Sequence, residues 1–107
     1  MVITLFRSRL RPEAREEYER WARRMNELAA EMPGFVSIKT FAADDGERIS
    51  IIEFDSEAAQ GAWRDHPEHR EAQRLGRERF YAEFQIQICA PVRRYGFSRA
   101  EGRRCED

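Results

Sequence analysis

The sequence contains no apolar run near the roughly 20 residues that a membrane-spanning helix needs, and its N-terminus lacks the basic and then apolar pattern of a secretory signal. Its two cysteines, Cys89 and Cys105, are too few for a disulfide framework and are not spaced like metal ligands. Neither sign of charge is in excess, because 19 lysines and arginines accompany 20 aspartates and glutamates. We therefore expect a soluble, cytoplasmic protein that has no electrostatic affinity for nucleic acid or for an anionic membrane.

Histidine is also scarce, since His66 and His69 are the only two in 107 residues. They flank Pro67, which can begin a helix at its first position but forces the residue before it out of helical geometry. The sequence therefore predicts one helix that ends near Asp65 and a second that starts at Pro67. Trp63 lies three residues before His66 and six before His69. A bent pair of helices could aim all three side chains at one concave spot.

The remaining apolar residues recur with the periods of strands and helices. The predicted elements are a strand over residues 2–10, a helix over 12–32, strands over 35–42 and 48–54 joined by an Asp-Gly turn, the bent helix pair, and a strand over 84–92. The order β-α-β-β-α-β predicts an α+β, ferredoxin-like domain, in which the helices cover one face of a four-stranded antiparallel sheet. We assign residues 1–97 to this domain.

The other face of the predicted sheet is rich in apolar side chains. Neighbouring residues of a strand point to opposite sides, so they cannot all face the helices: Ile3, Leu5, Phe35, Phe41, Ile49 and Ile51. The simplest way to cover this apolar face is a second copy of the chain, packed sheet against sheet in a two-fold homodimer. Residues 98–107 carry almost no apolar side chains, so we expect a flexible, dispensable C-terminal tail there.

The string AWRDHPEHREAQRLGRERFY, with GFVSIKTF before it and VRRYGF after it, resembles the antibiotic biosynthesis monooxygenase family of dimeric ferredoxin-like α/β-barrels. The likeness runs from about Val2 to Phe97. Its most specific parts are Pro33-Gly34-Phe35, Trp63-Arg64, His66-Pro67-Glu68-His69, Gln73 and Gly76-Arg77. The resemblance implies the dimeric barrel, whereas the reactions of the family vary: it includes cofactor-free oxygenases of polycyclic phenols, quinol oxygenases, haem degraders and isomerases.

Residue by residue, the resemblance carries over Trp63, which stands where polyketide-type oxygenases and haem degraders have a tryptophan that shapes the pocket. The polyketide oxygenases have a tyrosine six residues later, here His69, and an asparagine four residues earlier, here Ala59. Haem degraders place an iron-binding histidine ten residues after the tryptophan, where this chain has Gln73. The resemblance therefore implies no haem held in that manner, and it leaves His69 as the group that could substitute as a base.

From these residues we expect a small homodimeric monooxygenase that adds dioxygen-derived oxygen to an aromatic, polyketide-like or quinol substrate without a metal or a tightly bound flavin. Such a substrate must itself donate an electron to dioxygen, so a base must first remove a proton from it. His69 or His66, with an ordinary pKa near 6.5, could accept that proton near neutral pH. The side chains expected to line the substrate site are Trp63, Met25, Gln73, Phe80 and Tyr81.

Three alternatives stay open at this point. His66 could merely cap the second helix while His69 packs in a solvent-filled groove, and neither would then have a catalytic role. Haem degradation with altered ligands is a second enzymatic reading, and a small-molecule-binding or stress-response dimer that does no chemistry is a third. A metal site at His66, Glu68 and His69 is disfavoured, because Pro67 breaks the helical face and no further ligand nearby completes a tetrahedral set.

Overall fold

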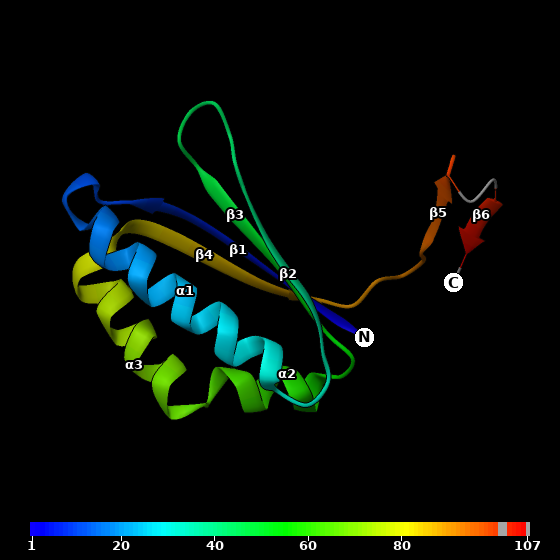
Figure 1. The fold of residues 1–107 in the computed structure, drawn as a ribbon, viewed down its shortest axis with the longest axis horizontal. Helices are drawn as coiled ribbons and strands as arrows, with labels where there is room; N and C mark the ends of the chain where they lie inside the picture. The colour runs from blue at the N-terminus through cyan, green and yellow to red at the C-terminus, as the bar shows by residue number, and fades with distance from the viewer. Residues whose placement is uncertain (101–102, 107) are drawn as a thin grey trace.

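The computed structural model of the chain describes residues 1–100 and the backbone of residues 103–106. Its elements, in order (Figure 1), are β1 (Val2–Leu10), the 3-10 turn η1 (Pro12–Ala14), α1 (Arg15–Glu31), β2 (Phe35–Ala42), β3 (Arg48–Phe54), α2 (Glu57–Arg64), α3 (Pro67–Leu75), the π-helical turn η2 (Gly76–Phe80), β4 (Tyr81–Cys89), β5 (Tyr95–Ser98) and β6 (Arg103–Glu106). The first three predicted strands and the break between the two later helices occur where the sequence places them. Among the described residues, no helix is long and apolar enough to cross a membrane.

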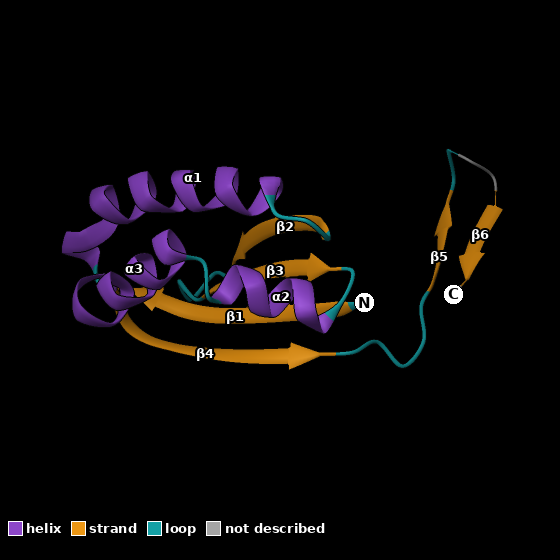
Figure 2. Cartoon of the chain, turned by 90° about the horizontal axis from the view of Figure 1, so that it is seen from below, coloured by secondary structure: helices purple, strands orange, loops and turns teal. Residues whose placement is uncertain are grey.

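One antiparallel sheet organises the domain, with the strand order β2-β3-β1-β4. Helices α1, α2 and α3 lie together on one face of this sheet, and the other face is bare (Figures 1 and 2). This confirms the predicted α+β, ferredoxin-like fold.

The last strand of the sheet differs from its prediction over residues 84–92. β4 starts at Tyr81, because the π-helical turn ends there and Tyr81 pairs at once with Leu10 of β1. It ends at Cys89, which pairs with Ile3 close to the start of β1. Pro91 has no N–H to donate, so it could not continue the ladder in any case.

Alternation along β1 assigns its residues to the two faces. Val2 packs against the buried core and Ser8 is itself buried, so these two residues face the helices while Ile3 and Leu5 face away. Cross-strand pairs such as Leu5 with Ile51 extend the assignment to the neighbouring strands. Five of the six apolar residues considered above therefore lie on the open face: Ile3, Leu5, Phe41, Ile49 and Ile51.

The sixth, Phe35, lies on the helix side. Its ring packs edge-on against that of Phe54, with the centroids 5.8 Å apart. The pairing of β2 with β3 shifts register between Phe35 and Ser37, and an irregularity of this kind re-aims a side chain without ending the strand.

Two buried clusters join the helices to the sheet. The first core cluster consists of Leu28, Ala29, Phe54 and Trp63, and the second of Ala14, Leu75 and Phe80. Val2 packs on the first and Leu10 on the second, so the clusters lie at opposite ends of β1. Any site formed between helices and sheet is framed by these two clusters.

The C-terminal segment stands apart from the sheet (Figures 1 and 2). β5 pairs antiparallel with β6, from Tyr95 opposite Glu106 to Ser98 opposite Arg103. The predicted tail over residues 98–107 falls partly outside the described residues, which omit 101–102 and 107. Its flexibility and dispensability stay predictions.

Two helical glycines provide a matched test of how closely η2 packs on β4. A Cβ on Gly76 would lie 2.8 Å from Cε2 of Tyr81 and 3.0 Å from Cδ2, whereas a Cβ on Gly61 would meet only the Arg64 guanidinium, at 3.5 Å. Alanine adds up to about 1 kcal/mol of helix propensity at either position, but overpacking a well-packed site costs about 1–3 kcal/mol. We expect Gly76→Ala to lower the melting temperature by several degrees and Gly61→Ala to raise it. Equal increases in both variants would show that the Tyr81 ring is free to move.

Candidate functional site

The joint between α2 and α3 is built by local rules. The Ser56 hydroxyl accepts a hydrogen bond from the Ala59 N–H at 3.1 Å and so caps the start of α2. α2 ends at Arg64, and His66 has an extended backbone (φ −59°, ψ 132°) before Pro67 begins α3. The chain therefore turns between two helices at the position that the proline dictates.

His66 serves as the cap of α3. Its Nδ1 accepts a hydrogen bond from the Glu68 N–H at 3.1 Å, which satisfies a donor that the helix leaves unpaired. The ring stands tilted beside Trp63, with centroids 6.0 Å apart. The structural alternative considered for this histidine, that it caps the second helix, matches its geometry.

His69 lies flat against Trp63. The two rings are 4.1 Å apart between centroids and within 12° of parallel. Nδ1 of His69 lies 2.9 Å from the main-chain oxygen of Trp63. A carbonyl oxygen only accepts, so Nδ1 carries the proton of this bond, and in the neutral ring Nε2 holds the free lone pair.

The electrostatics of this position favour the neutral ring. Burial lowers the pKa of His69 below its ordinary value, the hydrogen bond to the Trp63 carbonyl opposes the lowering, and the positive charge of His66 adds to it. His69 is therefore an uncharged base at neutral pH, and its protonation costs more than that of an exposed histidine.

Gln73, in the second half of α3, ties that helix to the end of α2. Its Nε2 donates to the main-chain oxygen of Arg64 at 2.9 Å. The same nitrogen lies 3.3 Å from Nδ1 of His69, but both atoms are donors in this arrangement, so the contact is not a hydrogen bond. An amide is a poor iron ligand compared with imidazole, so the residue present here does not fit a haem held in the manner of the haem degraders.

The other predicted wall residues divide between the two ends of the helix layer. Trp63 is only 6% exposed and belongs to the first core cluster, against which Met25 also packs. Phe80 is part of the second core cluster, and Tyr81 packs against it. The structure thus brings together Trp63, Met25, His66, His69 and Gln73, and it places Phe80 and Tyr81 elsewhere.

A strip of apolar side chains on β4 was missed in the sequence. Phe84, Ile86 and Ile88 pair with Ser8, Phe6 and Thr4 on the helix side of the sheet. They nevertheless keep 37%, 52% and 45% of their surface exposed, because β4 is an edge strand that the helices leave uncovered (Figure 2). The alternation of these residues with Gln85 and Gln87 predicts that one face of the strand joins the core, but the exposed fractions show that the helices leave much of this face uncovered. The period-two pattern thus predicts which face of β4 is apolar, but not that the helices leave that face exposed.

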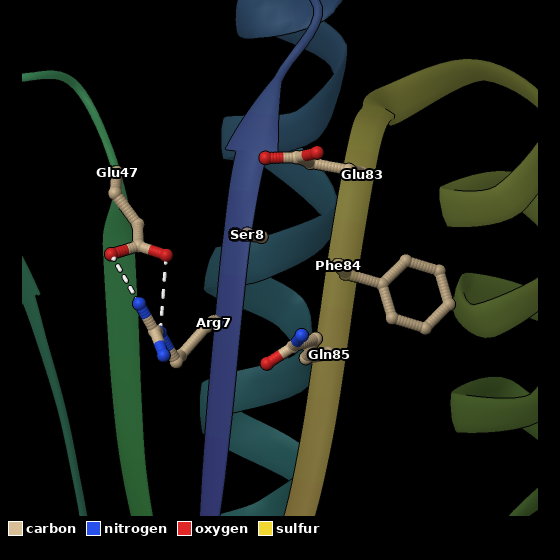
Figure 3. Close-up of a pocket in the computed structure, with 6 residues that line it drawn as sticks. All are labelled: Arg7, Ser8, Glu47, Glu83, Phe84 and Gln85. Carbon is tan, nitrogen blue, oxygen red and sulfur yellow. Dashed lines mark hydrogen bonds and ion pairs between the residues drawn. The ribbon is translucent and has the colours of Figure 1, made fainter.

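The open face carries a polar pocket of about 340 Å³, lined by Arg7, Ser8, Glu47, Glu83, Phe84 and Gln85 (Figure 3). Arg7 donates two hydrogen bonds to Glu47, at 3.0 and 3.1 Å, while Phe84 points away from that pair. None of the predicted site residues lines this pocket, and within residues 1–100 no group of three or more potential ligands is placed to hold a metal.

The pKa of His69 leads to a pH-dependent stability. Because its folded-state pKa is below the ordinary value, the unfolded chain takes up the proton first, so the contribution is complete above about pH 6.5 and is lost as the pH falls. We expect the difference in melting temperature between the native protein and His69→Gln to shrink between pH 7.5 and pH 5. The control His66→Asn retains His69 and a capping side chain, so it should keep the acid sensitivity. A constant difference across this range would contradict the burial of a neutral ring.

Known proteins resemble this chain in sequence and in structure. The model of the antibiotic biosynthesis monooxygenase family matches residues 1–75. The uncharacterized protein YqjZ of Bacillus subtilis is 35% identical over 71 residues, which cover 66% of this chain and 62% of YqjZ. The match therefore spans less than two thirds of that relative.

Solved structures share the fold at low sequence identity. Rv0793 from Mycobacterium tuberculosis superposes with a TM-score of 0.76 at 21% identity, over 85% of this chain and 94% of that one. A variant of SnoaB, a cofactor-independent oxygenase from Streptomyces nogalater, gives 0.73 at 17% identity, over 85% and 92%. Since the family model covers well over half of the sequence, the chain belongs to the antibiotic biosynthesis monooxygenase family.

Proposed function

We propose that this protein is a small homodimeric monooxygenase that adds oxygen to an aromatic, polyketide-like or quinol substrate without a metal or a tightly bound flavin. The observation that carries the proposal is the placement of His69, a partly buried imidazole that lies flat on Trp63 and bonds through Nδ1 to the Trp63 carbonyl, which leaves Nε2 as the free base. Family membership supports it, as does the shared fold of SnoaB, which is described as a cofactor-independent oxygenase.

The proposed reaction requires deprotonation of the substrate, electron transfer from the substrate to dioxygen, and an apolar pocket that excludes water. A phenol or quinol must lose a proton, and Nε2 of His69 can take it because Nδ1 is already committed to the Trp63 carbonyl. The resulting phenolate is electron-rich enough to pass an electron to dioxygen. Flat apolar walls must then hold the ring and exclude water, and we assign these walls to Trp63 and to the β4 strip of Phe84, Ile86 and Ile88.

The two histidines receive different roles in this proposal. His69 is the proton acceptor, whereas His66 positions α3 through its bond to the Glu68 N–H. Haem degradation with altered ligands is less well supported, because Gln73 stands at the ligand position and His69 has one nitrogen engaged.

Oxygen consumption tests this assignment. Polycyclic phenols and quinols are screened with an oxygen electrode, and the best substrate is used with the variants. We expect His69→Gln to lower the rate about 100-fold or more, because a positioned general base contributes about 10²–10⁴. His66→Asn keeps the cap and should stay within a few fold of the native rate. Binding of these compounds without oxygen uptake would instead identify a small-molecule-binding protein.

We also propose that the dimer forms through the open face of the sheet. Ile3, Leu5 and Ile51 are adjacent there and only partly buried by the chain itself. Covering them with a second copy removes apolar surface from water at about 25 cal/mol per Å². The two-fold arrangement closes the assembly, because each copy presents the same surface to the other.

Light scattering measures the mass of the protein in solution and therefore tests whether the dimer forms. At micromolar concentration we expect a mass about twice the 12.7 kDa of the chain. Ile51→Asp, which places a charge at the centre of the open face, should give a folded chain of monomer mass. Ile86→Asp makes the same change on the helix side of the sheet, where the side chain is already half exposed, and should leave the dimer intact. A monomeric native protein, or dissociation caused by Ile86→Asp alone, would contradict the proposal.

A further inference from the structure

A second polar position lies on the helix side of the sheet, away from Trp63. Arg48 is the first residue of β3, and it pairs with Ser8 of β1. Its guanidinium carbon lies 5.3 Å from the centre of the Tyr18 ring of α1. Because β3 ends at Phe54 in the first core cluster, Arg48 and Trp63 lie toward opposite ends of that strand.

Among the described residues, no carboxylate forms an ion pair with the guanidinium of Arg48. Its Nε is buried and has no hydrogen-bond partner among the residues that the structure describes. The ring of Tyr18 attracts the charge through its face, but it gives the N–H groups no acceptor. Buried donors are almost always paired, so an unpaired one calls for a missing acceptor.

Three carboxylates on the elements around Arg48 pair with other arginines. Glu47 precedes Arg48 in the chain, but strand alternation sends it to the open face, where it pairs with Arg7 at 3.0 Å. Glu83 of β4 pairs with Arg9 at 3.2 Å. Glu17, next to Tyr18 in α1, pairs with Arg79 at 2.6 Å.

The neighbour of Arg48 on β1 is a buried serine. Ser8 is only 4% exposed, and its hydroxyl can donate a hydrogen bond. Ser8 pairs with Arg48 on one side and with Phe84 on the other. Arg48 and Ser8 are thus neighbours in one row of the sheet, and each carries a side chain that can donate a hydrogen bond.

Aromatic rings surround this row. Phe6 and Phe84 stack with centroids 5.5 Å apart, and the Tyr81 ring stands edge-on to both, at 5.3 and 5.7 Å. Burial raises the pKa of Tyr81 well above its usual range, and the neighbouring Tyr18 adds to the rise. The Tyr81 phenol is therefore neutral and cannot neutralise Arg48, whereas the exposed part of Phe84 leaves apolar ring surface open to a ligand.

We propose that Arg48 and Ser8 bind the ionised oxygen of an aromatic anion whose ring lies against Phe6 and Phe84. A charge-assisted bond to a guanidinium is about twice as strong as a neutral one, and the apolar rings supply area for the flat part of the ligand. The inference names the substrate class of the monooxygenase proposed above and rests on that proposal for the reaction. Binding itself requires no turnover.

Titration calorimetry on the full chain tests the anion site with two pairs of probes. 2-Hydroxy-1,4-naphthoquinone carries an ionised ring oxygen and 2-naphthoate a carboxylate, and their neutral counterparts are 2-methoxy-1,4-naphthoquinone and 2-naphthamide. We expect at least one anion to bind more tightly than its neutral counterpart. Arg48→Met should weaken that anion about 10- to 100-fold and leave the neutral compound within about twofold. Which anion responds distinguishes a ring oxygen from a carboxylate.

Two further variants complete the test. Arg20→Met removes an exposed arginine from the outer surface of α1 and should change neither affinity. Ser8→Ala removes only a hydroxyl, so it should weaken the anion several-fold even if Arg48→Met does not fold. The inference is overturned if neither anion binds more tightly than its neutral counterpart, or if the variants weaken both members of a pair equally. Selective anion binding without oxygen uptake would refute the monooxygenase and leave this site standing.

Discussion

The proline at position 67 is the constraint on which the candidate site depends. Because Pro67 excludes helical geometry at His66, the chain stops α2 and starts α3 within two residues. The freed residue turns its ring back to cap the new helix, and the first turn of that helix then carries His69 onto Trp63. In a continuous helix, Trp63 and His69 would be six residues apart, about 9 Å along the axis and about 120° around it, and their rings would not stack. The stacked pair therefore exists because the helix is broken.

A second constraint, the alternation of the strands, decides which charges meet. Glu47 and Arg48 are adjacent in sequence, yet one contributes to the ion pair with Arg7 on the open face and the other lies among aromatic rings under α1. The sheet thereby separates opposite charges that an irregular loop would let pair. Within the part of the chain that the structure describes, Arg48 on the helix side has no ion-pair partner whereas Arg7 on the open face has one, and the alternation of the strands accounts for both.

Features governed by neighbours in sequence were accessible without the structure. The proline break, the Asp-Gly turn and the apolar stripes predicted the order of elements and the clustering of Trp63, His66 and His69, and the resemblance identified the family. Features governed by distant partners were not accessible. The exposure of Phe84 depends on how far the helices extend over the edge strand β4. Trp63 and Tyr81 lie apart because they belong to core clusters at opposite ends of β1. The unpaired Nε of Arg48 depends on where three carboxylates find other partners.

The π-helical turn before β4 sets the phase of that strand. The Tyr81 N–H bonds to the oxygen of Gly76, five residues earlier, so the turn holds one residue more than an α-helical turn would. Side chains in a strand alternate with a period of two, so removal of a single residue between Gly76 and Phe80 would exchange the two faces of everything downstream. Gln85 and Gln87 would then face the helices, and the apolar strip would move to the side of the sheet that carries Ile3 and Leu5. The length of this one turn thus determines whether the apolar side chains of β4 lie on the helix side or on the open face of the sheet.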